Sequence, residues 1–196
     1  MTNLITLEDY KISEGIQSTK DDGRIQTLIT SVSQLVKTYC GNSITDYFDT
    51  DKVETFNISW VSHVIQLTES PVNSIVSVKE RTSYADPYIT LSTDAHEFYF
   101  DADTDSILRT NGGTGYKNWP HGPGAVEVTY KAGYETCPAD LQLAVIDLIT
   151  YYVKDEHKAR QTIAGASINN QSSSSQRNNV AFPDHIKRVL DLYKNF

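Results

Sequence analysis

Apolar residues change their spacing twice along the chain, from a helical period to a strand period and back. Between Gly23 and Tyr39 they recur at i, i+3, i+4 and i+7, which is typical of a helix with one buried stripe. From about residue 44 to 134 they alternate with polar residues in short runs that turn-forming residues separate. After Pro138 the helical period returns. We therefore predict an α+β fold, in which a small helical bundle contains an inserted antiparallel β-sandwich or barrel-like region, 44–134.

Start and stop signals define four helices. Thr6 and Asp9 have the spacing of a capping box, with Asp in place of the usual Glu, and Gly15 is a typical helix end. Pro138 suits the first turn of a later helix, where its missing N–H costs nothing, and Asp140 places a negative charge at the positive end of the helix dipole. The predicted helices lie near residues 6–14, 22–40, 138–158 and 183–195.

The helix that begins after Pro138 is apolar on nearly every side. Its polar residues form only a narrow strip, which contains Gln142, Asp147, Thr150 and Lys154. Such a helix must be covered nearly all round. We expect the other helices to cover one flank and a neighbouring subunit to cover part of another.

The inserted region contains a series of short strands. Val126, Val128 and Tyr130 alternate with polar residues in the clearest of them, which ends at Gly133. The other strands are predicted near residues 56–60, 63–67, 72–78, 88–91, 97–100 and 107–109.

Length and composition are typical of one domain. With 196 residues, of which 39% are hydrophobic, the chain can form one good core, and its helical part is predicted at 1–43 and 135–196. Residues 161–179 contain few apolar side chains and a Ser- and Asn-rich run, which predicts a flexible loop. The helix after this loop is expected either to dock on a partner or to pack back on residues 25–39.

The charge and the cysteines narrow the range of functions. A net charge of −8 and a pI near 5.0 argue against a surface that grips nucleic acid, which normally carries clustered Lys and Arg. Cys40 and Cys137 form no CxxC pair and are too few for a disulfide scaffold, so a reducing cytosol is expected. We expect a soluble, unexported chain without membrane contact, because the sequence shows no secretory leader and no apolar run of about 20 residues.

Asp101, Asp103 and Asp105 have the carboxylate spacing that opens a calcium-binding loop. However, Ser106 occupies the position of the Gly that makes the sharp turn, and Gly112 occupies that of the bidentate Glu. Because the acidic run lies between two predicted strands, we interpret it as a hairpin turn. A weak calcium site stays open as an alternative.

No motif predicts catalysis or a cofactor. The Gly-rich segment 111–118 is followed neither by the Gly-Lys-Ser/Thr of a phosphate-binding loop nor by a helix. The five histidines show no HExxH spacing, and no Ser lies in a G-x-S-x-G turn. We therefore predict that the protein is not an enzyme and binds no cofactor.

Several short segments follow one another in a characteristic order. They are residues 22–41 with Tyr39-Cys40-Gly41 at the end, Pro71 to Val78, Trp119-Pro120, Val126 to Tyr134, Cys137 to Leu141, and Phe182-Pro183 leading to Tyr193-Lys194. In this order they resemble the head-tail connector family of tailed bacteriophages, also described as adaptor or head completion proteins, in its long form with a β insertion. Cys137 departs from the aliphatic residue that the family more often has there, and the loop 161–179 is long.

The resemblance implies a structural virion protein of the phage neck. Such a protein forms a ring, typically of twelve copies, between the portal and the head-closure (stopper) or tail-completion proteins, and the genomic DNA passes through its lumen without specific binding. The resemblance also implies that the chain is in the host cytoplasm during assembly. The residues that we expect at interfaces are Ile146, Ile149, Tyr152, Arg160, Ile163, Ile186, Leu190, Tyr193 and Phe196.

A second hypothesis comes from a different class of protein. The β region is also compatible with a β-sandwich binding module for calcium or carbohydrate, with Asp101, Asp103 and Asp105 as ligands. Calorimetry with calcium distinguishes the two hypotheses.

Overall fold

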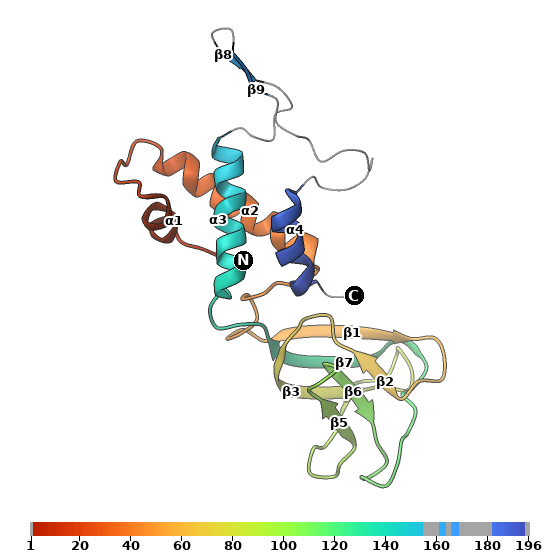
Figure 1. Ribbon diagram of the computed structural model, residues 1–196. Helices are drawn as coiled ribbons and strands as arrows, with labels where there is room; N and C mark the ends of the chain where they lie inside the picture. Colours follow the sequence, from red (N-terminus) through yellow and green to blue (C-terminus); the bar gives the residue numbers. More distant parts are fainter. Residues whose placement is uncertain (1, 155–160, 164–165, 169–181, 195–196) are drawn as a thin grey trace. The chain divides into compact units, whose positions relative to one another are not determined.

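The computed structural model describes residues 2–154, 161–163, 166–168 and 182–194 (Figure 1). The chain divides into two compact units, a helical unit (Met1–Asn42 and Thr136–Lys194) and a β unit (Ser43–Glu135). The predicted α+β fold with an inserted antiparallel region is confirmed.

The helical unit contains the four predicted helices. They are α1 (Leu7–Glu14), α2 (Asp22–Cys40), α3 (Ala139–Val153) and α4 (Asp184–Leu190), and a 3-10 turn, η1 (Asp191–Tyr193), follows the last. The capping box at the start of α1 is present, because the Thr6 hydroxyl accepts a hydrogen bond from the Asp9 N–H (3.1 Å) and the Asp9 carboxylate accepts one from the Thr6 N–H (3.0 Å). No helix in the described part of the chain is long and apolar enough to cross a membrane.

Helix α2 forms the centre of the helical unit, and α1, α3 and α4 all pack against it. Its apolar stripe is buried as the spacing predicted, with Ile25, Ile29, Val32 and Val36 almost inaccessible to solvent. Helix α3 ends at Val153, and the predicted continuation over 155–158 lies outside the described residues.

The β unit contains two antiparallel sheets. The larger has the order β1-β7-β3-β4, and the smaller has the order β2-β6-β5. The strands are β1 (Lys52–Ile58), β2 (Val64–Gln66), β3 (Val72–Glu80), β4 (Ile89–Thr90), β5 (Phe98–Asp101), β6 (Ser106–Arg109) and β7 (Gly122–Ala132). A further pair of strands, β8 (Gln161–Ile163) and β9 (Ala166–Ile168), forms a separate two-stranded sheet.

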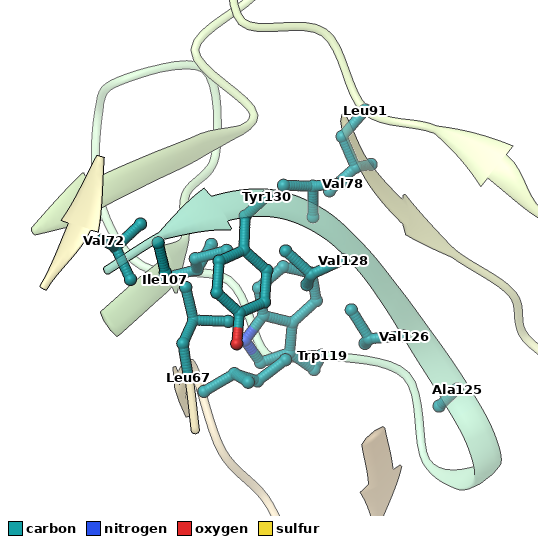
Figure 2. Packing of buried hydrophobic residues seen from close by; sticks show 12 residues of the cluster. Leu67, Val72, Val78, Leu91, Ile107, Trp119, Ala125, Val126, Val128 and Tyr130 are labelled. Atoms are coloured by element: carbon teal, nitrogen blue, oxygen red, sulfur yellow. The ribbon is translucent and has the colours of Figure 1, made fainter. Parts of the chain in front are cut away.

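Strand β7 lies at the centre of the β unit because it pairs with both β1 and β3. Its alternation is the predicted one, with Val126, Val128 and Tyr130 fully buried. Figure 2 shows these side chains packed around Trp119 and against Ile107 of the smaller sheet. One apolar cluster therefore joins the two sheets of the β unit.

Candidate interaction surfaces

Helix α3 is largely buried inside the helical unit. Ile146 and Ile149, which we predicted at an interface, are both buried, and Ile149 has no exposed surface. Leu143 is the exception, because 59% of its side chain is exposed. Leu143 precedes Asp147 by four residues and therefore lies on the polar strip of the helix. Among the described residues of α3, Leu143 is the large apolar side chain that is left exposed.

The other predicted interface residues differ in how far they are exposed to solvent. Ile186 and Leu190 are buried, Tyr152 and Tyr193 are half-buried, and Ile163 lies in β8. Arg160 and Phe196 lie outside the described residues. The helical unit itself already covers Ile149, Ile186 and Leu190, whereas the half-buried tyrosines keep accessible surface.

Helix α4 packs back on α2, as the second of the two expectations for it stated. The Tyr39 ring meets the Phe182 ring edge to face at 4.9 Å, and the Tyr39 hydroxyl donates a hydrogen bond to Asp191 (2.6 Å). Burial and this bond to a carboxylate raise the pKa of Tyr39 to about 12. The Tyr193 hydroxyl donates to Asp140 on α3 (2.5 Å). Polar bonds to α2 and α3 therefore hold η1 in place.

The acidic run 101–106 is the hairpin turn that the sequence predicted, and it joins β5 to β6. The Asp101 carboxylate accepts hydrogen bonds from the Asp103 N–H (3.1 Å) and the Thr104 hydroxyl (2.9 Å), and the Asp105 carboxylate accepts one from the Val72 N–H (2.9 Å). These oxygens stabilise the turn and its attachment to β3. Among the described residues, no three His, Cys, Asp or Glu side chains are placed to hold a metal ion.

Both cysteine thiols are buried and protonated. Burial raises the pKa of Cys40 to about 11 and that of Cys137 to about 12, and nearby carboxylates act in the same direction. A thiol is nucleophilic only as the thiolate, so neither residue is arranged as a nucleophile. The Cys40 thiol lies 3.6 Å from the Leu190 carbonyl as a weak donor.

A buried ion pair connects the two sheets of the β unit. Arg109 on β6 is 2% exposed and donates two hydrogen bonds to the Glu80 carboxylate on β3 (2.8 and 2.9 Å). Its remaining donors reach the carbonyls of Glu97 and Thr110, and its guanidinium lies 5.9 Å from the Trp119 ring centre. Sequence reasoning missed this pair, because the two residues are 29 positions apart and lie on different sheets.

A second polar cluster holds the start of the β unit. The Glu69 carboxylate accepts hydrogen bonds from the N–H and the hydroxyl of Ser43 (2.7 and 2.9 Å) and pairs with Lys52 (2.8 Å), which also pairs with Glu54 (2.8 Å). Burial acts to lower the pKa of Lys52, but the two carboxylates outweigh it and the pKa lies above its ordinary value.

The chain enters and leaves the β unit side by side. The Tyr134 N–H donates to the Ile44 carbonyl (2.7 Å), and the Ala132 N–H donates to the Tyr47 carbonyl (3.0 Å). Gly133 lies between these bonds with a φ of +96°, and a Cβ at this position would lie 2.3 Å from the Ile44 carbonyl oxygen. Only glycine permits this close approach.

The negative charge of the chain is concentrated in the β unit. Its sequence contains fourteen acidic and six basic residues and therefore accounts for the whole net charge of −8. The helical segments contain eleven of each sign. The chain thus combines a neutral unit with a strongly acidic one.

Two sequence comparisons relate this chain to known proteins over nearly its whole length. The family model described as "Head completion protein" matches residues 3–196. The head completion protein of Escherichia phage T5 is 24% identical over 191 residues, which cover 97% of this chain and 98% of that protein.

Solved structures share the fold at low sequence identity. A chain from the neck of an empty gene transfer agent particle, computed with C6 symmetry, is 11% identical with a TM-score of 0.63, and 98% of this chain and 90% of that chain are covered. A chain from the neck of the native particle, computed with C12 symmetry, is 14% identical with a TM-score of 0.54, over 100% of this chain and 96% of that chain. Because the family model covers almost every residue, the chain belongs to the head completion protein family, whose members are structural phage proteins and not enzymes.

Proposed function

We propose that this protein forms a ring in the phage neck, between the portal and the head-closure or tail-completion proteins, and that the genomic DNA passes through its lumen. The match to head completion proteins over residues 3–196 carries the proposal. The shared fold with neck chains of a particle solved with C6 and C12 symmetry supports the ring and favours twelve copies.

The charge distribution supports a lumen that does not hold DNA. Proteins that grip DNA neutralise phosphates with Lys and Arg, and their affinity falls steeply as salt rises. The acidic β unit repels phosphates instead. We expect no binding of duplex DNA to the purified protein at low or high salt, and tight, salt-sensitive binding would contradict a passive lumen.

The surface of the helical unit is suited to contacts with other subunits. Leu143 on α3 and Leu192 in η1 are 59% and 76% exposed, although both are large apolar residues. Burial of such side chains stabilises an interface by about 1.5–3 kcal/mol each. The half-buried Tyr152 and Tyr193 add aromatic surface to the same unit.

Cryo-electron microscopy of virions that contain this chain tests the proposal. We expect density for a ring of this fold directly below the portal in the wild type. Particles produced without the chain should contain packaged heads that do not join tails, and supplying the chain in trans should restore joining. Normal particles without the chain, or density for it outside the neck, would contradict the proposal.

A further inference from the structure

A pocket of about 440 Å³ lies beside the edge strand of the smaller sheet. Strand β5 is the last strand in the order β2-β6-β5, and its residues Tyr99 and Asp101 line the pocket. Leu108 of β6, which pairs with Tyr99, and Tyr116 of the β6–β7 connection line it as well. Every described residue that lines the pocket belongs to the β unit, so its geometry does not depend on where the helical unit lies.

Two tyrosine rings form exposed walls of this pocket. Tyr99 is 60% exposed and Tyr116 is 68% exposed, although both are large aromatic residues. The Tyr116 ring lies against the ring of His63 with the ring centres 4.5 Å apart, and this contact holds it in position. Among the described residues, neither tyrosine hydroxyl has a hydrogen-bond partner. Both rings are therefore open to contact with a ligand.

Among the described lining residues, Asp101 supplies the only carboxylate of the pocket. Its two oxygens accept hydrogen bonds from the Asp103 N–H (3.1 Å) and the Thr104 hydroxyl (2.9 Å), which fix the orientation of the group. An ionised carboxylate offers about four acceptor positions, so each oxygen can accept a further bond. In the described part of the chain, Asp101 has no ion-pair partner.

The sequence around the pocket is strongly negative. Residues 82–108, which include β4, β5 and most of β6, contain no Lys or Arg and six acidic residues. These are Asp86, Asp94, Glu97, Asp101, Asp103 and Asp105. The next cations along the chain are Arg109, which is buried against Glu80, and Lys117, which lies 3.9 Å from Glu80 and does not line the pocket. A cationic ligand is therefore attracted to this pocket, and a phosphate is repelled.

The β unit already combines arginine with aromatic rings inside its own fold. The Arg81 guanidinium lies 4.5 Å from the ring centre of Tyr88. Arg109 donates two hydrogen bonds to Glu80 and lies 5.9 Å from the ring centre of Trp119. A guanidinium can make both contacts because it is planar, stacks on aromatic faces and donates two parallel hydrogen bonds to a carboxylate.

We propose that Tyr99, Tyr116 and Asp101 form a binding site for an arginine side chain of a partner protein. In this site the guanidinium lies against the tyrosine rings and donates hydrogen bonds to the carboxylate. Lysine binds the site more weakly, because its compact ammonium is more strongly hydrated and lacks the planar fork. The site gives a chemistry to one contact between the ring and another protein of the neck, and to this extent it rests on the proposed function.

Amide chemical shifts of the purified full-length chain test the site with a defined probe. The chain is titrated with acetyl-Gly-Arg-Gly-amide and with the same peptide carrying Lys or citrulline, the uncharged isostere of Arg. We expect saturable shifts at pocket amides such as those of Tyr99, Gly113 and Gly115, with an affinity that falls from Arg to Lys to citrulline. The absence of shifts in the pocket, or equal affinity for the citrulline peptide, would overturn the proposal.

Two variants with matched controls assign the binding to the named side chains. Asp101→Asn, which keeps one acceptor oxygen for the turn, and Tyr116→Ser should each weaken binding of the Arg peptide by at least about fivefold. Asp103→Asn removes the same charge from an exposed residue of the same turn, and Tyr84→Ser removes an exposed tyrosine (73%) outside the pocket. Both controls should bind like the wild type. Wild-type affinity in Tyr116→Ser, or equal losses in Asp101→Asn and Asp103→Asn, would contradict the site.

Maltose is the probe for the other class of ligand that an aromatic pocket with a carboxylate can hold. A neutral sugar gains nothing from the surrounding negative charge, so we expect no shifts at the concentration that saturates the Arg peptide. Pocket shifts with maltose at or below that concentration would assign the site to carbohydrate and overturn the proposal.

Photo-cross-linking in the virion identifies the partner. Benzoylphenylalanine is incorporated in place of Tyr99, and the cross-linked peptides are sequenced by mass spectrometry. We expect an Arg-containing segment of a different neck protein, and the same label in place of Tyr84 should not capture it. A segment of this chain, a segment without Arg, or no cross-link would overturn the proposal.

The failure of this inference differs from the failure of the proposed function. A chain that is found in the neck but whose pocket does not bind the Arg peptide removes only the arginine site. A chain that binds the peptide in the pocket but is absent from the neck removes only the proposed place in the virion.

Discussion

The two units of this protein differ in net charge and in the partners of their buried charged side chains. The helical unit has no net charge, and its buried Lys37 on α2 donates a hydrogen bond to the backbone carbonyl of Thr2 (2.7 Å). The β unit carries the whole charge of −8 and buries an ion pair, Arg109 with Glu80, inside its fold. Apolar packing tolerates changes of shape, whereas a buried ion pair fails when one partner is removed. The comparison indicates that the acidic unit depends on a specific buried ion pair, whereas the neutral unit depends mainly on apolar packing.

The largest effect is expected for Arg109→Ala. This change leaves Glu80 charged and without its main partner, which typically costs about 3–5 kcal/mol of unfolding free energy. Both tryptophans, Trp60 and Trp119, lie in the β unit, so tryptophan fluorescence during denaturation reports on that unit. The fluorescence transition should shift strongly, while the helical transition seen by circular dichroism should shift less.

Lys117→Ala is the control for this prediction. The Lys117 ammonium lies 3.9 Å from Glu80 on a side chain that is 53% exposed, and an exposed pair contributes about 0–1 kcal/mol. Equal shifts of both transitions in Arg109→Ala would show that the two units unfold as one.

Ile149→Ala should have the next largest effect, and it should destabilise the helical unit more than the β unit. Ile149 is fully buried in the helical unit, and the cavity left by such a truncation costs about 2–5 kcal/mol. We expect the helical transition to move to lower denaturant, with a smaller change in tryptophan fluorescence. Leu143→Ala, on the exposed side of the same helix, should change stability by less than about 0.5 kcal/mol.

A moderate effect is expected from acid, through Glu54. Burial acts to raise the pKa of this carboxyl, but hydrogen bonds from Lys52 and Thr68 outweigh it, so the folded-state pKa lies below the ordinary value of 4.5. The resulting stabilisation is present above about pH 4.5 and is lost as the pH falls through the folded-state pKa.

The measurement is the fluorescence midpoint of the β unit at several pH values. Glu54→Gln should lower the midpoint at neutral pH and flatten its fall in acid. Asp51→Asn, which removes the charge of an exposed neighbour, should retain the wild-type slope. An unchanged slope in Glu54→Gln would assign the acid sensitivity to other carboxylates.

The smallest effect on stability and the clearest effect on assembly are expected for Leu143→Lys. The exposed side chain can project its charge into water, so the melting temperature should hardly change. Incorporation into virions should fall, because the charge would be buried against a neighbour. Gln26→Lys, an exposed change on α2, is the control, and normal incorporation of Leu143→Lys would remove α3 from the interface.

Local signals in the sequence predicted the helices well. The capping box at Thr6, the glycine after Cys40 and the apolar stripe of α2 act over a few residues, and the boundaries of α2 agree with the prediction. The pairing order β1-β7-β3-β4 and the Arg109–Glu80 pair depend on contacts between distant residues, which a local pattern does not contain.

The sequence was less informative about surfaces. An apolar stripe predicts that Ile149, Ile186 and Leu190 are buried, but it does not show whether the same chain or a neighbour covers them. The composition of 161–179 predicted a flexible loop. Residues 161–163 and 166–168 instead form β8 and β9, and the rest of this range lies outside the described residues. The open edge of β5 became visible only from the strand order.

The close approach of the two ends of the β unit at Gly133 has a consequence for the evolution of the chain. The two ends of the β unit are one hydrogen bond apart, from Tyr134 to Ile44, so the whole unit closes like a short loop. Long insertions with adjacent ends add little closure entropy to the fold that contains them. The β unit can therefore be lengthened, shortened or exchanged as a module while the sequence of the helical unit stays the same. The glycine is the part of the module that must be retained, since any Cβ there would force the two ends apart.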